Sequence, residues 1–255
     1  MANPKKILEF NVLILGETGV GKSTFINAFV NYLLFKTLDD AINAEQLMSL
    51  IPSHFSITDE KFQIRDIVFG NDANEETRAG ASSTQEARSY KFPVGNAVIR
   101  LIDTPGIGDT RGAHVDEENF KTVLSLLSQL SELHGICILL KPTHARLTVS
   151  FEYCLKQLFS YLHKNACNNI SFIFTNTRSM LYSVGDTLPT IKEVFRQISS
   201  VSPHVEIPFN EHNVFCVDNE AFRFLLAKRQ GIHFSEGDKN DFKLSWEKSE
   251  EVYEK

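Results

Sequence analysis

The chain has 255 residues, 42% of them hydrophobic, which is enough to bury one sizeable core. Its formal net charge of −6 leaves no basic surplus to neutralise a phosphate backbone, so we do not expect a dedicated nucleic-acid-binding protein. No apolar run approaches the roughly 18 residues that a membrane-spanning helix needs. The sequence therefore predicts a cytoplasmic protein with no transmembrane segment, and it leaves peripheral association with a membrane open.

The four cysteines predict ordinary thiols and not a redox or metal site. They are spread along the chain without a Cys-x-x-Cys pair, and most of them lie in apolar segments. We therefore expect buried, reduced thiols, as in cytosolic proteins. The residues are Cys137, Cys154, Cys167 and Cys216.

One segment matches the phosphate-binding loop pattern at every fixed position: Gly16, Glu17, Thr18, Gly19, Val20, Gly21, Lys22 and Ser23. It lies between an apolar run and a helix-compatible run that starts at Thr24, so we expect a strand-to-helix turn that binds a nucleotide. Glycines let successive N–H groups point at phosphate oxygens, and the helix adds its positive N-terminal end. Lys22 is expected on the β- and γ-phosphates and the Ser23 hydroxyl on Mg²⁺.

A second motif, Asp103-Thr104-Pro105-Gly106, ends a predicted hairpin of strands at 89–94 and 97–102. An acidic residue at the carboxyl end of an apolar strand is where a P-loop nucleotidase holds Mg²⁺ through a water molecule. We therefore expect Asp103 at the metal and the Gly106 N–H at the γ-phosphate.

The rest of the chain alternates strands and helices, which predicts an α/β fold of the P-loop NTPase type. We expect a three-layer, doubly wound, mostly parallel sheet with one antiparallel strand, and an insertion at 37–80 before the second motif. Residues 1–235 form one predicted domain and 236–255 a predicted helical tail, and the two alternatives for its end are a cut from a longer chain and a natural terminus. Strands are expected at 62–69, 135–140, 170–175 and 214–217, and helices at 41–51, 120–133, 149–162, 188–198 and 221–227.

With residues 16–24 and 103–109, the chain resembles the septin and immunity-associated (GIMAP, AIG-type) branch of the TRAFAC P-loop GTPases. The resemblance implies a G domain that binds GTP or GDP with Mg²⁺ and that forms a homodimer or a higher assembly. It also implies that residues 82–84 are the switch I segment, with Thr84 on Mg²⁺ and the γ-phosphate and Ser83 as the alternative. An ordinary Ser/Thr-rich surface loop is the structural alternative.

The base-recognition motif departs from the family pattern. Where GTPases have Asn/Thr-Lys-x-Asp, this chain has Thr175-Asn176-Thr177-Arg178, so a donor-only arginine replaces the carboxylate that accepts hydrogen bonds from guanine. Two alternatives remain. In the first, Asp218, beside Asn219, supplies the missing carboxylate. In the second, Arg178 and Asn176 stack on the base while backbone groups form hydrogen bonds with its edge. The switch motifs favour GTP.

The hydrolytic machinery departs as well, because Ile107 stands where small Ras-like GTPases place a water-orienting glutamine. An aliphatic side chain cannot polarise water, so we expect slow hydrolysis. The resemblance implies that a partner completes the site, through dimerisation across the nucleotide face. The candidate helpers are Thr84 in cis, and Arg111 or His114 from the loop after the second motif. A solvated loop arginine is the alternative for Arg111.

The alternative functions are a non-hydrolysing pseudo-GTPase that acts as an interaction module, and a P-loop ATPase. The histidines lack metal-ligand spacing, and we interpret His134, His144 and His163 as ordinary surface or strand-end residues. In the segment 141–148, Thr148 is expected to cap a helix, with a dimer contact as the alternative.

Overall fold

The computed structural model describes residues 8–59, 61–70, 87–108, 113–162, 164–201 and 206–253. Its main sheet has the strand order β4-β5-β1-β6-β7-β8, in which β4 is antiparallel to β5 and the other neighbours are parallel. The strands are β1 (Leu8–Gly16), β4 (Arg88–Val94), β5 (Ala97–Asp103), β6 (Gly135–Leu140), β7 (Ile170–Phe174) and β8 (Val214–Cys216). The predicted hairpin and the predicted mostly parallel sheet are therefore confirmed.

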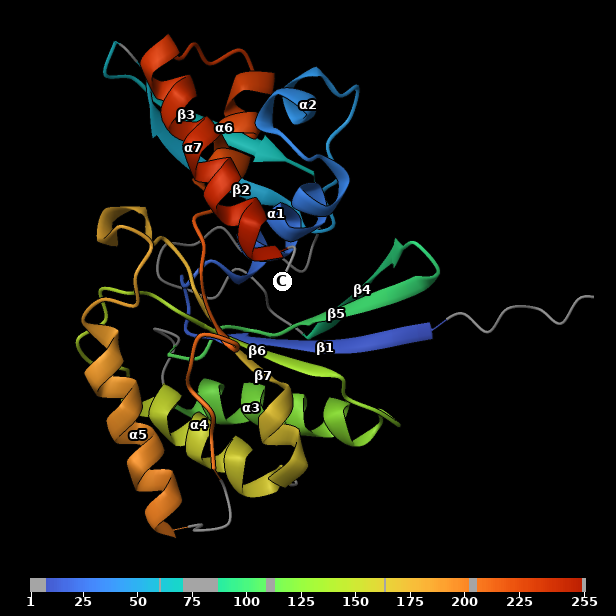
Figure 1. Ribbon diagram of the computed structural model, residues 1–255, viewed down its shortest axis with the longest axis vertical. Helices are drawn as coiled ribbons and strands as arrows, with labels where there is room; N and C mark the ends of the chain where they lie inside the picture. The colour runs from blue at the N-terminus through green and yellow to red at the C-terminus, as the bar shows by residue number, and fades with distance from the viewer. Residues whose placement is uncertain are drawn as a thin grey trace, which may run out of the picture.

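Helices cover both faces of this sheet (Figure 1). On one face lie α3 (Ala113–Ser128), α4 (Val149–Tyr161) and α5 (Thr187–Val201), and on the other lies α1 (Lys22–Leu34). Helices α6 (Glu220–Arg229) and α7 (Glu236–Tyr253) pack on α1 on that same side. Because side chains alternate along a strand, Leu13 of β1 enters the core under α3–α5, whereas Ile14 enters the core under α1. The three-layer, doubly wound α/β fold is thus confirmed. Two 3₁₀ helices, η1 (Lys164–Asn169) and η2 (Arg178–Met180), flank β7.

The insertion forms a small unit of α2 (Leu38–Asn43) and an antiparallel pair of strands, β2 (Ser53–Thr58) and β3 (Ile64–Phe69). Ile67 of β3 joins the same buried cluster as Phe224 of α6 and Trp246 of α7. The guanidinium of Arg223 lies 4.4 Å from the centroid of the Phe55 ring. Strand β3 lies in the strand predicted for 62–69, whereas β2 was not predicted.

The helix predicted for 41–51 is wrong beyond Asn43, because two buried asparagines of α1 bind the following backbone. The Asn27 amide oxygen accepts from the backbone N–H groups of Leu50 and Ile51 at 2.9 and 3.0 Å. The Asn31 side chain pairs with both backbone groups of Met48. These bonds replace the helical ones and hold the segment against α1 in a non-helical conformation.

Helix α7 lies within the stretch that the sequence analysis set apart as a tail, and it packs on α1. The Trp246 side chain is fully buried, with its ring centroid 4.4 Å from that of Tyr32 and its indole N–H donating to the Lys36 carbonyl oxygen at 3.3 Å. The Tyr253 ring stacks on Tyr32 as well. The last described helix therefore shares the core of the insertion and α1.

The four cysteines are free thiols. Burial raises the pKa of Cys137 and of Cys154 to about 12, and that of Cys216 to about 11. These thiols are protonated near neutral pH, which makes them poor nucleophiles. In the parts of the chain that the structure describes, none of the helices combines the length and the apolar character needed to span a membrane.

Candidate functional site

The predicted phosphate loop joins β1 to α1 at the carboxyl ends of the parallel strands. Gly19 and Gly21 have φ angles of 73° and 96°, in the left-handed region that favours glycine, and Gly21 directly precedes α1. The Lys22 ammonium is almost buried and donates to the carbonyl oxygens of Gly16 and Glu17 at 3.1 and 3.2 Å. The lysine therefore lies over its own loop, with the N-terminus of α1 beside it.

The second motif packs directly on this loop. The Thr18 N–H donates to the Ile107 carbonyl oxygen at 2.7 Å, and the Ile107 N–H donates to the Gly16 carbonyl oxygen at 3.2 Å. A Cβ atom added to Gly106 would lie 2.6 Å from the Thr18 Cα, so the two backbones touch. Asp103 is fully buried at the end of β5. The two predicted motifs thus form one continuous surface.

The oxygen groups at this surface suit a hard divalent cation. Ser23 lies half-buried in the first turn of α1, and Asp103 ends the neighbouring strand β5, three residues before Gly106, which packs on Thr18. Hydroxyl and carboxylate oxygens, completed by water and phosphate oxygens, are the ligands that Mg²⁺ prefers. Among the described residues, no group of three or more His, Cys, Asp or Glu side chains forms a metal site without such help. Thr84, the third predicted metal ligand, lies outside the described residues, as does Ser83.

The end of β7 is tied to the phosphate loop. The Thr175 hydroxyl donates to the Val20 carbonyl oxygen at 2.7 Å, and the Thr177 hydroxyl donates to the Val217 carbonyl oxygen at 2.9 Å. Between them, Asn176 is exposed with a φ of 55°. The segment in the base-recognition position is therefore anchored on both sides, and its middle residue faces solvent.

Arg178 points away from this segment toward the last two helices. Its guanidinium lies 2.8 Å from a carboxylate oxygen of Asp241 and 3.8 Å from one of Glu220, and 5.8 Å from the centroid of the Phe242 ring. These contacts are half-exposed ion pairs of small individual strength, but together they orient the side chain. They give no support to the alternative in which Arg178 stacks on a base.

Asp218 connects the loop after β7 with the loop after β8, where the base of a nucleotide is expected. Its carboxylate is almost fully buried and accepts from the backbone N–H groups of Arg178 and Glu220 at 3.1 and 3.0 Å. The neighbouring Asn219 is also buried, and its amide oxygen accepts from the Tyr253 hydroxyl at 3.4 Å. Both residues hold loops in place in this structure, and base reading by Asp218 stays a prediction.

The residue in the water-orienting position is a core residue. The Ile107 side chain is buried in the cluster under α3 and α4, so it has no polar group to offer a water molecule. His114 is exposed at the start of α3. Arg111, the predicted finger, lies outside the described residues, as does His163.

A link between the phosphate loop and the start of α4 was missed by the sequence analysis. The buried Glu17 carboxylate accepts from the Thr148 N–H at 2.8 Å and lies 2.9 Å from Nδ1 of His144. His144 lies beyond the end of β6, as expected of a strand-end histidine, and its contact with this carboxylate was not predicted. The predicted helix cap is confirmed, because the Thr148 hydroxyl accepts from the Phe151 N–H at 3.2 Å. The sequence did contain a signal for this link, namely the carboxylate of Glu17 within the phosphate loop. A buried carboxylate needs a hydrogen-bond partner, so a partner elsewhere in the chain could have been expected.

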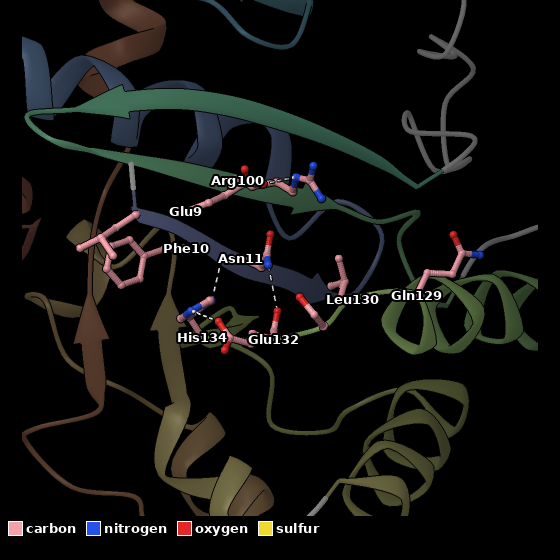
Figure 2. A pocket seen from close by; sticks show the side chains of 10 residues that line it. Glu9, Phe10, Asn11, Arg100, Gln129, Leu130, Glu132 and His134 are labelled. Atoms are coloured by element: carbon pink, nitrogen blue, oxygen red, sulfur yellow. Dashed lines mark hydrogen bonds and ion pairs between the residues drawn. The ribbon is translucent and has the colours of Figure 1, made fainter. Parts of the chain in front are cut away.

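A hollow of about 430 Å³ lies at the other end of β1, and Figure 2 shows its lining. The Asn11 amide donates to the Glu132 carbonyl oxygen at 2.9 Å, and the His134 ring lies edge-on to Phe10. Arg100, on the neighbouring strand β5, forms an ion pair with Glu9 of β1. This hollow is at the amino end of the strand, opposite the phosphate loop, so it is separate from the candidate site.

Comparison with known proteins found a similarity in sequence and a looser one in fold. No protein-family model matches the chain. GTP-binding protein A of Dictyostelium discoideum is 25% identical over 173 residues, which are 68% of this chain and 29% of that protein. A dimerization-deficient mutant of Toc33 from Arabidopsis thaliana aligns with 84% of this chain and 72% of its own, at 13% identity and a TM-score of 0.49. Toc33 in complex with Mg²⁺ and GMPPNP has the same coverages, 12% identity and a TM-score of 0.47.

Proposed function

We propose that the chain is a Mg²⁺-dependent, guanine-nucleotide-binding switch that hydrolyses GTP slowly, of the septin and immunity-associated type. The observation that carries the proposal is the phosphate loop closed over by Lys22, with the Asp103–Gly106 backbone packed on it. The similarity to a GTP-binding protein over 68% of the chain supports guanine as the base.

In this proposal, water attacks the γ-phosphate in line with the leaving oxygen. The loop N–H groups and the Lys22 ammonium stabilise the charge that develops on the phosphate oxygens. When bound, Mg²⁺ would be held by Ser23, by Asp103 through water and by Thr84, and it would neutralise charge on the β- and γ-phosphates. The Gly106 N–H would contact the γ-phosphate. The conformation of the loop after Gly106 would therefore depend on whether the γ-phosphate is bound.

We also propose that the protein is cytoplasmic and forms a homodimer or higher assembly through its nucleotide face. The support is the aliphatic Ile107, whose burial leaves the attacking water without a side chain in that position. A second copy would supply the missing polar group, with Arg111 as the first candidate. A partner-supplied arginine is a known way to complete such a site.

Replacing Gly106 by alanine is expected to lower GTP hydrolysis about 10- to 100-fold, because small misplacements of reacting groups are costly. The added Cβ would lie 2.6 Å from the Thr18 Cα and 2.9 Å from its nitrogen, and backbone cannot rotate away as a side chain can. The measurement is phosphate release under saturating GTP. Gly135→Ala is the matched control, since its Cβ would come no nearer than ordinary contact distance, 3.6 Å from Val12 side-chain atoms and 4.0 Å from the Asn169 carbonyl oxygen. A wild-type rate for Gly106→Ala would contradict the assigned role.

A titration of GTP against ATP tests the base. We expect the wild-type protein to prefer GTP and Arg178→Asp to strengthen that preference about tenfold, because it adds an acceptor for the guanine N–H groups. Arg178→Ala is the control, since it removes the contact with Asp241 without adding a carboxylate. An absence of GTP preference in the wild type would overturn guanine and favour an ATPase. Equal preferences for the two variants would show that position 178 does not read the base.

A second candidate function is a non-hydrolysing pseudo-GTPase that acts as an interaction module, and the core position of Ile107 favours it. The nucleotide that the purified protein retains distinguishes the two. Mass spectrometry of the released nucleotide finds GTP if hydrolysis has been lost and GDP if the protein turns over.

A further inference from the structure

We propose that His144 and Thr148 are positioning residues of the phosphate loop and act through Glu17. The inference rests on the proposed function, because it concerns how the same loop is held for a nucleotide. Neither residue belongs to the phosphate-loop motif or to the second motif. Both lie in the segment between β6 and α4, at the same carboxyl edge of the sheet.

The contacts form an unbroken chain to the lysine. His144 Nδ1 and the Thr148 N–H hold the two carboxylate oxygens of Glu17, at 2.9 and 2.8 Å. The backbone carbonyl oxygen of the same Glu17 accepts from the Lys22 ammonium at 3.2 Å. The orientation of the Glu17 side chain therefore determines where one of the oxygens that place the ammonium lies.

The segment 141–148 is itself held from behind, so it can serve as an anchor. The His144 N–H donates to the Thr187 hydroxyl at 3.0 Å, and the same hydroxyl donates to the Lys141 carbonyl oxygen. Thr187 is fully buried at the first position of α5. The Thr148 side chain caps α4 and faces Gly108, where an added Cβ would lie 3.2 Å from its hydroxyl oxygen.

The negative charge of Glu17 explains why its carboxylate must be held away from the phosphates. Glu17 places a carboxylate inside a loop that must receive phosphates, and like charges repel strongly where water is excluded. The side chain is turned away into a site where it is only 7% exposed. A buried carboxylate keeps such a position only when its oxygens are hydrogen-bonded. Without His144 or the Thr148 N–H, the carboxylate and its backbone would shift toward the phosphates.

Release of a fluorescent GDP analogue from the full chain, chased with unlabelled GDP in the presence of Mg²⁺, tests the inference. We expect His144→Ala and Glu17→Ala each to speed release about tenfold, as the loss of a hydrogen bond to a charged group does. The double variant should be no faster than Glu17→Ala, because both changes act through the same carboxylate. His144→Asn should restore slow release, since its amide keeps an N–H donor.

The control is His212→Ala, which removes an exposed histidine from a turn outside the site. Melting temperatures without nucleotide accompany each variant, because a merely structural role would lower them equally for His144→Ala and His144→Asn while leaving release unchanged. If the wild type loads the analogue but His144→Ala releases it at the wild-type rate, or if the two alanine effects add, the inference is overturned. A wild type that loads no guanine nucleotide would instead overturn the proposed function.

Discussion

Lys22→Ala is expected to lower the rate of GTP hydrolysis about 100- to 1,000-fold, the range seen when one preorganised donor to a developing charge is removed. In this structure the ammonium is almost buried and is held over the loop by the Gly16 and Glu17 carbonyl oxygens. It is therefore already placed before a nucleotide arrives, and little reorganisation is needed when charge moves onto the phosphate oxygens. Alanine removes both the charge and its placement.

The measurement is phosphate release at saturating GTP, together with the dissociation constant for GDP. Lys192→Ala is the matched control, because Lys192 is exposed on α5 at the far side of the sheet. Equal rates for wild type and Lys22→Ala would rule out hydrolysis at this loop. A loss of GDP affinity with no measurable turnover in the wild type would instead favour the pseudo-GTPase.

Trp246→Ala is expected to lower the free energy of unfolding by about 3–5 kcal/mol, as large-to-small changes at buried aromatic positions do. The side chain is fully buried in the cluster that joins the insertion, α1, α6 and α7. Its removal leaves a cavity beside Tyr32 and leaves the Lys36 carbonyl oxygen without its indole donor. A loss of this size is a large fraction of the stability of an ordinary domain.

Urea unfolding followed by circular dichroism measures this loss. Leu244→Ala is the control on the same helix, because that side chain is 54% exposed and its truncation leaves no cavity. Trp246→Phe keeps an aromatic ring against Tyr32 and should recover more than half of the lost stability. A Trp246→Ala protein within about 1 kcal/mol of the wild type would mean that α7 is not needed for the core.

The dense packing of α7 also bears on the base end of the site. Asp241 on α7 orients the Arg178 side chain, and the Ser249 hydroxyl accepts from the Asp218 N–H at 3.0 Å. Stability of the last helix and the shape of the base-recognition loops are therefore coupled through these contacts. The Trp246→Ala protein should for this reason also lose nucleotide affinity.

The sequence by itself determined the phosphate loop, the second motif and the alternation of strands and helices in the main sheet. These features are short-range, because the glycines, Lys22 and Ser23 act within one strand-to-helix turn, and buried parallel strands appear as short apolar runs such as 135–140. The Thr148 cap was predictable for the same reason, since a cap bonds only three residues along the chain.

Only the tertiary structure decided which distant groups meet. Glu17 and Thr148 are 131 residues apart, and no sequence motif predicts that they are in contact. The direction of Arg178 depends on Asp241 of a later helix, and the path of residues 47–51 depends on Asn27 and Asn31 of α1. Local patterns report periodicity and turns within a few residues. Pairing across the fold depends on which surfaces the packed helices and strands bring together, and no single stretch of the chain contains that information.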